Sequence, residues 1–105
     1  MTTFDEREHA FEAKFAHDAE LRFRAEARRT HLLGRWAAKK LGLTGDEAEA
    51  YAKALIRADF ATAGHEDLLG KLAADLDGRA DEAEIRAMMA ETLVQARAQI
   101  LEETE

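Results

Sequence analysis

The chain has 105 residues, enough for one domain, and 47% of them are hydrophobic, although almost half of those are alanine. It contains no cysteine and no serine, which excludes a disulfide, a thiolate metal site and a thiol or serine nucleophile. The net charge of −7 is uneven, because residues 1–21 carry −4, residues 22–40 carry +6 and residues 41–105 carry −9.

The basic island at residues 22–40 raises the question of nucleic acid. The acidic remainder would repel phosphates, however, and no aromatic ladder accompanies the bases. We expect a cationic helix packed beside acidic helices, and no nucleic-acid partner. Because no apolar run approaches the ~20 residues that cross a bilayer and the N-terminus does not look like a signal peptide, we expect a cytoplasmic protein that is not membrane-spanning.

Abundant Ala, Glu, Leu, Arg and Lys, with few β-branched residues and no proline, predict an all-α fold. The first helix is predicted over residues 3–41. Thr3 and Glu6 have the spacing of a capping box, and Gly42 is suited to a left-handed C-terminal cap.

Three further helices follow, so that the sequence predicts a small antiparallel four-helix bundle. The second begins with the capping box of Thr44 and Glu47, the third covers residues 66–76, and Asp81 with Glu84 opens the fourth. Their predicted apolar faces hold Ala48, Tyr51, Ala52, Leu55 and Phe60, then Leu68, Leu69, Leu72 and Leu76, then Ile85, Met88, Met89, Leu93, Ala96 and Ile100.

The lengths of these helices indicate an arm at the N-terminus. As one helix, residues 3–41 would be about 58 Å long, whereas the fourth helix would reach only about 33 Å. The bundle can therefore cover only residues 21–41, which belong to a globular domain of residues 21–105. We expect residues 1–20 to overhang as a conditionally helical arm that is frayed or disordered when free and folds on binding.

Phe4, Phe11 and Phe15 are the large apolar residues of this arm, and they fall within about 40° of one another around a helix. Such a narrow aromatic stripe is well shaped to enter a groove on another protein. The alternative is that the arm folds back on the bundle and completes its core.

Other candidate sites are weaker. Arg24, Arg28, Arg35 and Lys39 share a helix face and could hold an anion such as a nucleotide phosphate, or could form a solvated or internally paired face. His9 with Glu12 offers half a metal site, but no second ligand pair follows. Since no carboxylate pair sits in an obvious apolar pocket, we expect neither an enzyme nor a bound cofactor or metal.

Several segments are similar to the zeta-subunit inhibitors of bacterial F-type ATP synthases. They are TTFDEREHAFEAKFAHD at residues 2–18, LRFRAEARR at 21–29, LLGRWAA at 32–38, EAEAYA at 47–52 and RADF at 57–60. The resemblance covers essentially the whole chain and is most specific from residue 3 to residue 60.

The resemblance implies a small four-helix protein that inhibits ATP hydrolysis by the catalytic sector of the synthase. Its N-terminal segment would become helical and enter a catalytic interface between the α and β subunits, close to the rotating γ subunit. The protein would then be peripheral to the inner membrane. Carried over, Phe4, Phe11 and Phe15 would be apolar anchors, while Arg7 and Lys14, with Asp5, Glu8 and Glu12, would make polar contacts. The alternative is a non-inhibitory helical module of the same family, with a weak nucleotide ligand for which the row of Arg24, Arg28, Arg35 and Lys39 is the candidate site.

Overall fold

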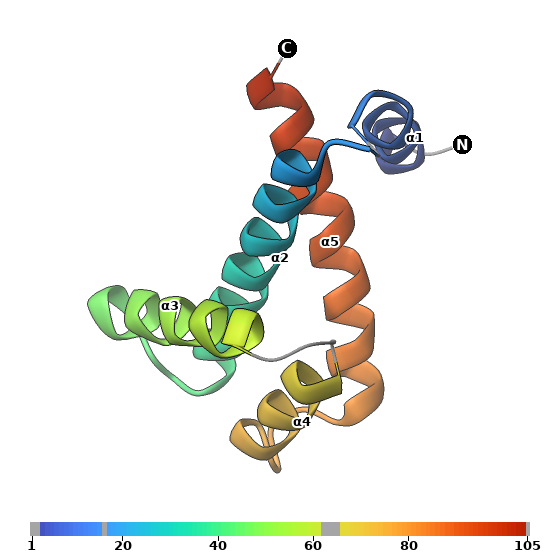
Figure 1. Ribbon diagram of the computed structural model, residues 1–105. Helices are drawn as coiled ribbons and strands as arrows, with labels where there is room; N and C mark the ends of the chain where they lie inside the picture. Colours follow the sequence, from blue (N-terminus) through green and yellow to red (C-terminus); the bar gives the residue numbers. More distant parts are fainter. Residues whose placement is uncertain (1–2, 16, 62–65, 105) are drawn as a thin grey trace.

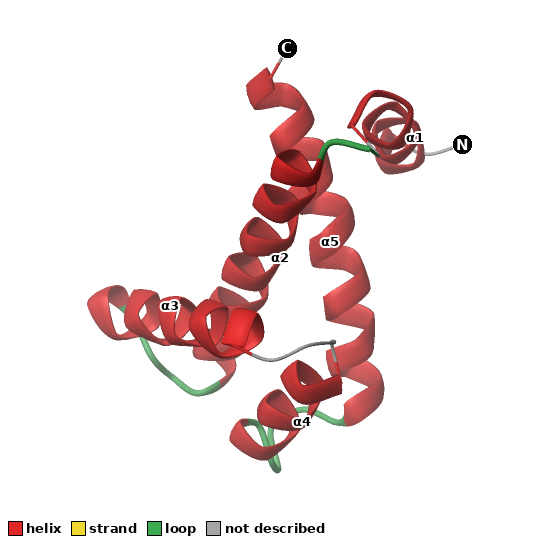
Figure 2. Ribbon diagram, in the orientation of Figure 1, coloured by secondary structure: helices red, strands yellow, loops and turns green. Residues whose placement is uncertain are grey.

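The computed structural model describes residues 3–15, 17–61 and 66–104, and for residues 3–5 and 7 it describes the backbone only. These residues form five helices, and no strand occurs among them (Figure 2). The helices are α1 (Thr3–Phe15), α2 (Ala19–Lys40), α3 (Gly45–Ala61), α4 (Glu66–Asp75) and α5 (Glu82–Thr104). The predicted all-α class is confirmed.

α2 is the central helix of the fold. It packs along α5, which runs antiparallel to it, and α3 lies across its C-terminal half (Figure 1). α4 packs on α3 and on the beginning of α5, whereas α1 packs on α5 near the opposite end of the molecule. The structure therefore does not confirm an antiparallel four-helix bundle, because α3 crosses α2 instead of running beside it.

The crossing of α2 and α3 depends on small residues. A Cβ added to Gly34 would lie only 2.7 Å from the Cα of Ala52, so the two backbones meet where neither helix carries a large side chain. A buried polar group fixes the same pair of helices further along. The Thr30 hydroxyl donates to Asp59 Oδ2 at 3.1 Å, and the Arg29 Nη2 lies 3.6 Å from the same oxygen.

The main core is rich in leucine and lies where α2, α3, α4 and α5 meet. Its buried members are Leu33, Ala37, Leu55, Leu68, Leu69, Leu72, Leu76 and Ile85. The predicted faces of the second, third and fourth helices supply most of them. Phe60 was expected on such a face but is 38% exposed and stacks on Phe23, which is 55% exposed, at 4.6 Å between ring centroids. At 100° per residue, Phe60 lies about 140° around the helix from Leu55, so it has left the buried stripe.

Local capping signals are confirmed at Gly42 and Asp81, whereas no hydrogen bond of the predicted capping box of Thr44 and Glu47 is found among the described residues. Gly42 has φ +79°, and the Leu43 amide donates to the carbonyl of Ala38 while the Gly42 amide donates to that of Lys39. These are the two hydrogen bonds of a Schellman motif, so the helix ends where the glycine predicts. At the start of α5, Asp81 Oδ1 accepts a hydrogen bond of 2.8 Å from the Glu84 amide.

The single helix predicted over residues 3–41 is wrong. α1 ends at Phe15 and α2 begins at Ala19, with Asp18 as its N-cap in an extended conformation. The Asp18 side chain accepts a hydrogen bond of 3.1 Å from the Leu21 amide, which satisfies one of the amides left without a helical partner at the break. This break changes the direction of the chain and brings α1 back onto α5 (Figure 1).

Candidate functional site

The predicted partner-binding face of α1 is turned toward the protein's own helices. Phe11 is 2% exposed and Phe15 is 8% exposed. Their rings meet edge to face at 5.5 Å between centroids. They belong to a second, smaller group of apolar residues, called here the N-terminal cluster, whose buried members are Phe11, Phe15, Ala25, Ile100 and Leu101, with Leu21 packed against them.

The structure therefore differs from the expected overhanging arm. The length argument assumed a straight helix from residue 3 to residue 41, which would have left nothing for the phenylalanines to cover. Because the chain breaks at Asp18, the stripe of α1 instead reaches α5 and buries two aromatic rings. The alternative in which the segment folds back on the other helices describes the observed arrangement, except that its rings form a cluster of their own and do not join the main core.

Arg97 of α5 is the polar centre of this contact. Its Nη1 pairs with Glu8 Oε1 and lies 3.7 Å from Glu12 Oε1. Its guanidinium also lies 5.6 Å from the centre of the Phe11 ring, within the range of a cation–π contact. Glu8, Phe11 and Glu12 occupy one stripe of α1, since residues three and four apart are neighbours on a helix.

The other residues predicted to bind a partner are placed differently. The side chains of Phe4 and Arg7 lie outside the part of the chain that the structure describes. Lys14 is exposed, and its Nζ lies 5.3 Å from the centre of the Phe15 ring. Of the five predicted residues, Phe11 and Phe15 are therefore inaccessible in this arrangement and Lys14 is open to solvent.

The predicted row of cations on α2 is divided between two neighbours. Arg28 donates to Gln99 Oε1 at 2.8 Å and pairs with Glu103 Oε2 at 2.7 Å, while Arg24 lies 3.6 Å from Glu103 Oε1. The hydrogen bond from Arg28 is the main cause that lowers the pKa of Glu103. These two cations hold α2 to the C-terminal half of α5, as an internally paired face does.

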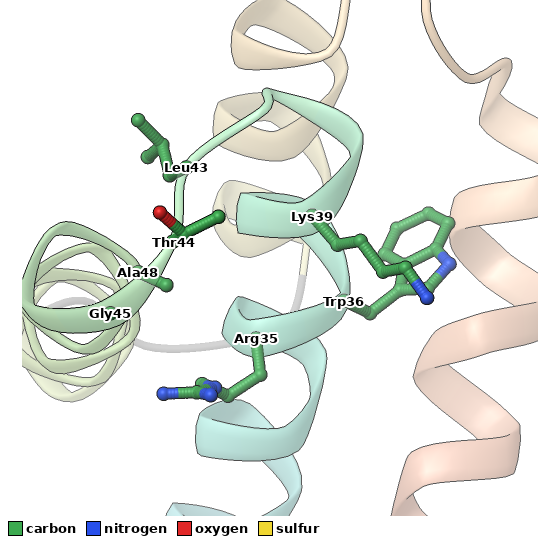
Figure 3. A pocket seen from close by; sticks show the side chains of 7 residues that line it. All are labelled: Arg35, Trp36, Lys39, Leu43, Thr44, Gly45 and Ala48. Atoms are coloured by element: carbon green, nitrogen blue, oxygen red, sulfur yellow. The ribbon is translucent and has the colours of Figure 1, made fainter.

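The other half of the row, Arg35 and Lys39, borders an open hollow. This hollow has a volume of about 520 Å³ and is lined by Arg35, Trp36, Lys39, Leu43, Thr44, Gly45 and Ala48. In Figure 3, Arg35 and Lys39 extend from α2 in different directions, Arg35 toward α3 and Lys39 alongside Trp36.

Arg35 Nη1 also pairs with Glu49 Oε2 at 3.1 Å. His31 Nε2 lies 2.8 Å from the other oxygen of this carboxylate. The hydrogen bond with His31, and then the pairing with Arg35, lower the pKa of Glu49. The structure thus brings the four cations together in pairs and not as one site.

The described residues offer no grouping of metal ligands. Within residues 3–15, 17–61 and 66–104, no three His, Cys, Asp or Glu side chains are placed to hold a metal ion. Tyr51 has its pKa raised by burial and by the hydrogen bond of 2.8 Å that it donates to Asp75. This contact joins α3 to α4 within the fold.

The sequence profile of the family described as ATPase inhibitor subunit zeta matches residues 1–99. The chain belongs to this family. A solved structure determined by solution NMR is 49% identical to it, with 79% of this chain and 98% of that chain covered and a TM-score of 0.73. None of the curated proteins compared with it is significantly similar.

Membership of the zeta family supports several of the expectations at a coarse level. It indicates a regulatory inhibitor subunit associated with an ATP synthase, and not an enzyme. Among the described helices, none is long and apolar enough to cross a membrane.

Arg97 was missed by the sequence analysis. The signal was present, because Arg97, Ile100 and Leu101 repeat at three and four residues on α5, as Glu8, Phe11, Glu12 and Phe15 do on α1. The spacing within each helix, however, does not predict that these two stripes pack against each other.

Proposed function

We propose that this zeta-family protein inhibits ATP hydrolysis by inserting α1 at a catalytic interface between the α and β subunits, near the rotating γ subunit. In this proposal Phe4, Phe11 and Phe15 are the apolar anchors, and Arg7 and Lys14 make polar contacts. The observation that carries the proposal is that α1 is a separate helix with its own small apolar stripe, joined to α2 by a break at Asp18.

The packing of α1 supports this assignment. α1 packs mainly on α5, and its two buried rings belong to the N-terminal cluster and not to the main core. α1 can therefore leave α5 without opening the contacts of α2 with α3 or of α4 with α5. Once released, it presents two aromatic rings four residues apart, the spacing with which an amphipathic helix enters a groove.

Lys14 gives a direct test, because it is exposed and lies in α1. Lys14→Glu should weaken inhibition of the purified cognate catalytic sector severalfold, measured as the protein concentration that halves ATP hydrolysis. The matched control is Lys53→Glu, which makes the same charge change at an exposed position of α3. The proposal fails if the unmodified protein leaves hydrolysis unchanged, and the role of Lys14 fails if both variants behave alike.

A second candidate function is the binding of a nucleotide in the hollow beside Trp36. Arg35 and Lys39 supply positive charge there, and Trp36 offers a ring. Calorimetric titration with ATP, ADP and inorganic phosphate tests it. Lys39→Ala should weaken binding while Arg24→Ala does not, and equal effects of the two substitutions would argue against this hollow.

A further inference from the structure

We propose that the contact between α1 and α5 is an autoinhibitory clasp, centred on Arg97, that holds the inhibitory helix out of reach of its target. This inference rests on the proposed function and concerns its regulation. The clasp consists of Glu8, Phe11 and Glu12 of α1 and Arg97 of α5. The first support for this clasp is that α1 uses the same face to dock on α5 and, in the proposed function, to bind the synthase. Phe11 and Phe15 are buried against α5 and cannot contact a second protein at the same time.

Arg97 is committed to this contact. Both ion pairs that it makes with described residues are to α1, and its ring contact is to Phe11. Its side chain is 27% exposed, so these charges are partly shielded from solvent and interact more strongly than a fully exposed pair would. One side chain of the globular part thus contacts three residues of α1.

The clasp is also imperfect, as a contact that must open should be. Glu8 Oε2 is buried and accepts no hydrogen bond from the described residues, which disfavours the docked state. A hollow of about 300 Å³ at the same contact is lined by Phe11, Glu12, Arg22 and Arg97. The docked helix therefore leaves a polar atom unsatisfied, at a contact that also has a hollow open to solvent.

The consequence is a population effect on inhibition. Only the open form can bind the synthase, so the apparent dissociation constant is the intrinsic one divided by the open fraction. If about 90–99% of the molecules are closed, complete release would strengthen inhibition by roughly 10–100-fold. Arg97→Ala leaves the partly buried Glu8 without its cation and should favour the open form, while every residue of α1 stays unchanged.

The experiment compares the full-length protein with its Arg97→Ala and Arg86→Ala variants. Arg86 is the matched control, because it is an exposed arginine of the same helix whose ion pairs are to Glu82 and Glu66, away from α1. Amide hydrogen exchange of the free proteins reports whether α1 is docked. The concentration that halves ATP hydrolysis by the catalytic sector reports inhibition.

We expect Arg97→Ala to lower the protection of α1 amides and to inhibit at a lower concentration, and Arg86→Ala to do neither. If the unmodified protein slows hydrolysis, the clasp is refuted and the proposed function stands in two cases: α1 protection is unchanged in Arg97→Ala, or α1 is released and inhibition is no stronger. If α1 is released and no variant slows hydrolysis, the proposed function fails and the clasp has nothing to regulate.

Discussion

The two apolar clusters described above differ in the helices that contribute side chains to them. The main core takes leucines from α2, α3 and α4 and closes on Ile85 of α5, so that each helix there depends on several others. The N-terminal cluster is made of two rings from α1 and three side chains from α2 and α5. Removing α1 leaves the main core complete, whereas losing the main core removes the surface on which α1 docks.

This comparison suggests a division of labour within one short chain. The main core sets whether the protein is folded, and the N-terminal cluster sets where α1 lies. The two should therefore respond to different substitutions, and the following four experiments test whether they do.

The largest effect is expected in the main core. Leu72 is fully buried there, and Leu72→Ala should lower the free energy of unfolding by about 2–5 kcal/mol, because it removes apolar burial and leaves a cavity. The thermal midpoint, measured by far-UV circular dichroism, should fall by about 10–20 °C. Leu72→Met, which nearly conserves volume, is the control and should cost less than about 1.5 kcal/mol.

Gly34→Ala should have the next largest effect. The new Cβ would meet the Ala52 Cα at 2.7 Å, so α2 and α3 must move apart, at a cost of about 1–3 kcal/mol. Gly70→Ala is the control, because a Cβ there meets nothing within 4 Å and the residue lies inside α4. Amide exchange should show loss of protection in α3 with α1 unaffected, and an earlier loss in α1 would contradict the division of labour.

Phe11→Ala should release α1 with a smaller effect on the rest of the protein. The substitution can cost at most the free energy with which α1 docks on α5, because the contacts of the main core do not include α1. The thermal midpoint should therefore fall by less than half the amount seen with Leu72→Ala. Amide exchange should show the loss in α1. Phe23→Ala, at an exposed ring of α2, is the control.

A fall as large as that of Leu72→Ala would mean that the two clusters unfold as one unit. Phe11→Ala should also weaken inhibition, because it removes an anchor. In this it differs from Arg97→Ala, which releases α1 intact.

The smallest effect concerns Glu103, which joins α2 to α5 beside the N-terminal cluster. Arg28 lowers the pKa of Glu103 in the folded protein. The ion pairs of Glu103 therefore stabilise the fold at a pH above the ordinary carboxyl pKa of about 4.3. This stabilisation is lost as the pH falls through the lowered pKa of the folded protein. Glu103→Gln should therefore be slightly less stable at pH 7, and the difference should vanish in acid. A stability difference between the two proteins that grows as the pH falls would contradict this role of Glu103.

The sequence was most informative where the signal is local. The cap at Gly42, the cap at Asp81 and the leucine face of α4 are set by residues within one or two turns, and the structure has each of them. The break at Asp18 was not predicted, because a good N-cap inside a helical pattern competes with continuation of the helix. The break allows Phe11 and Phe15 to pack against Ile100 and Leu101 of α5, more than 80 residues away in the chain.

The candidate site shows the same limit. The stripe of Phe11 and Phe15 was found from its spacing, but the side chain that faces it, Arg97, could be identified only from the fold. The row of cations on α2 is continuous along the helix. Arg24 and Arg28 nevertheless pair with α5, whereas Arg35 pairs with α3 and Lys39 lies on the same half of the row. Which neighbour covers which part of a face is a property of tertiary packing.

The position of Trp36 has a practical consequence. It is the chain's only tryptophan, and with Tyr51, the only tyrosine, it packs against the main core. The aromatic residues described in the N-terminal cluster are both phenylalanines. Intrinsic fluorescence excited in the indole band will therefore report melting of the main core and stay nearly silent when α1 departs. A dye attached through a cysteine introduced into α1 would be chemically unique in this cysteine-free chain, and with Trp36 it would give two optical signals for the two events.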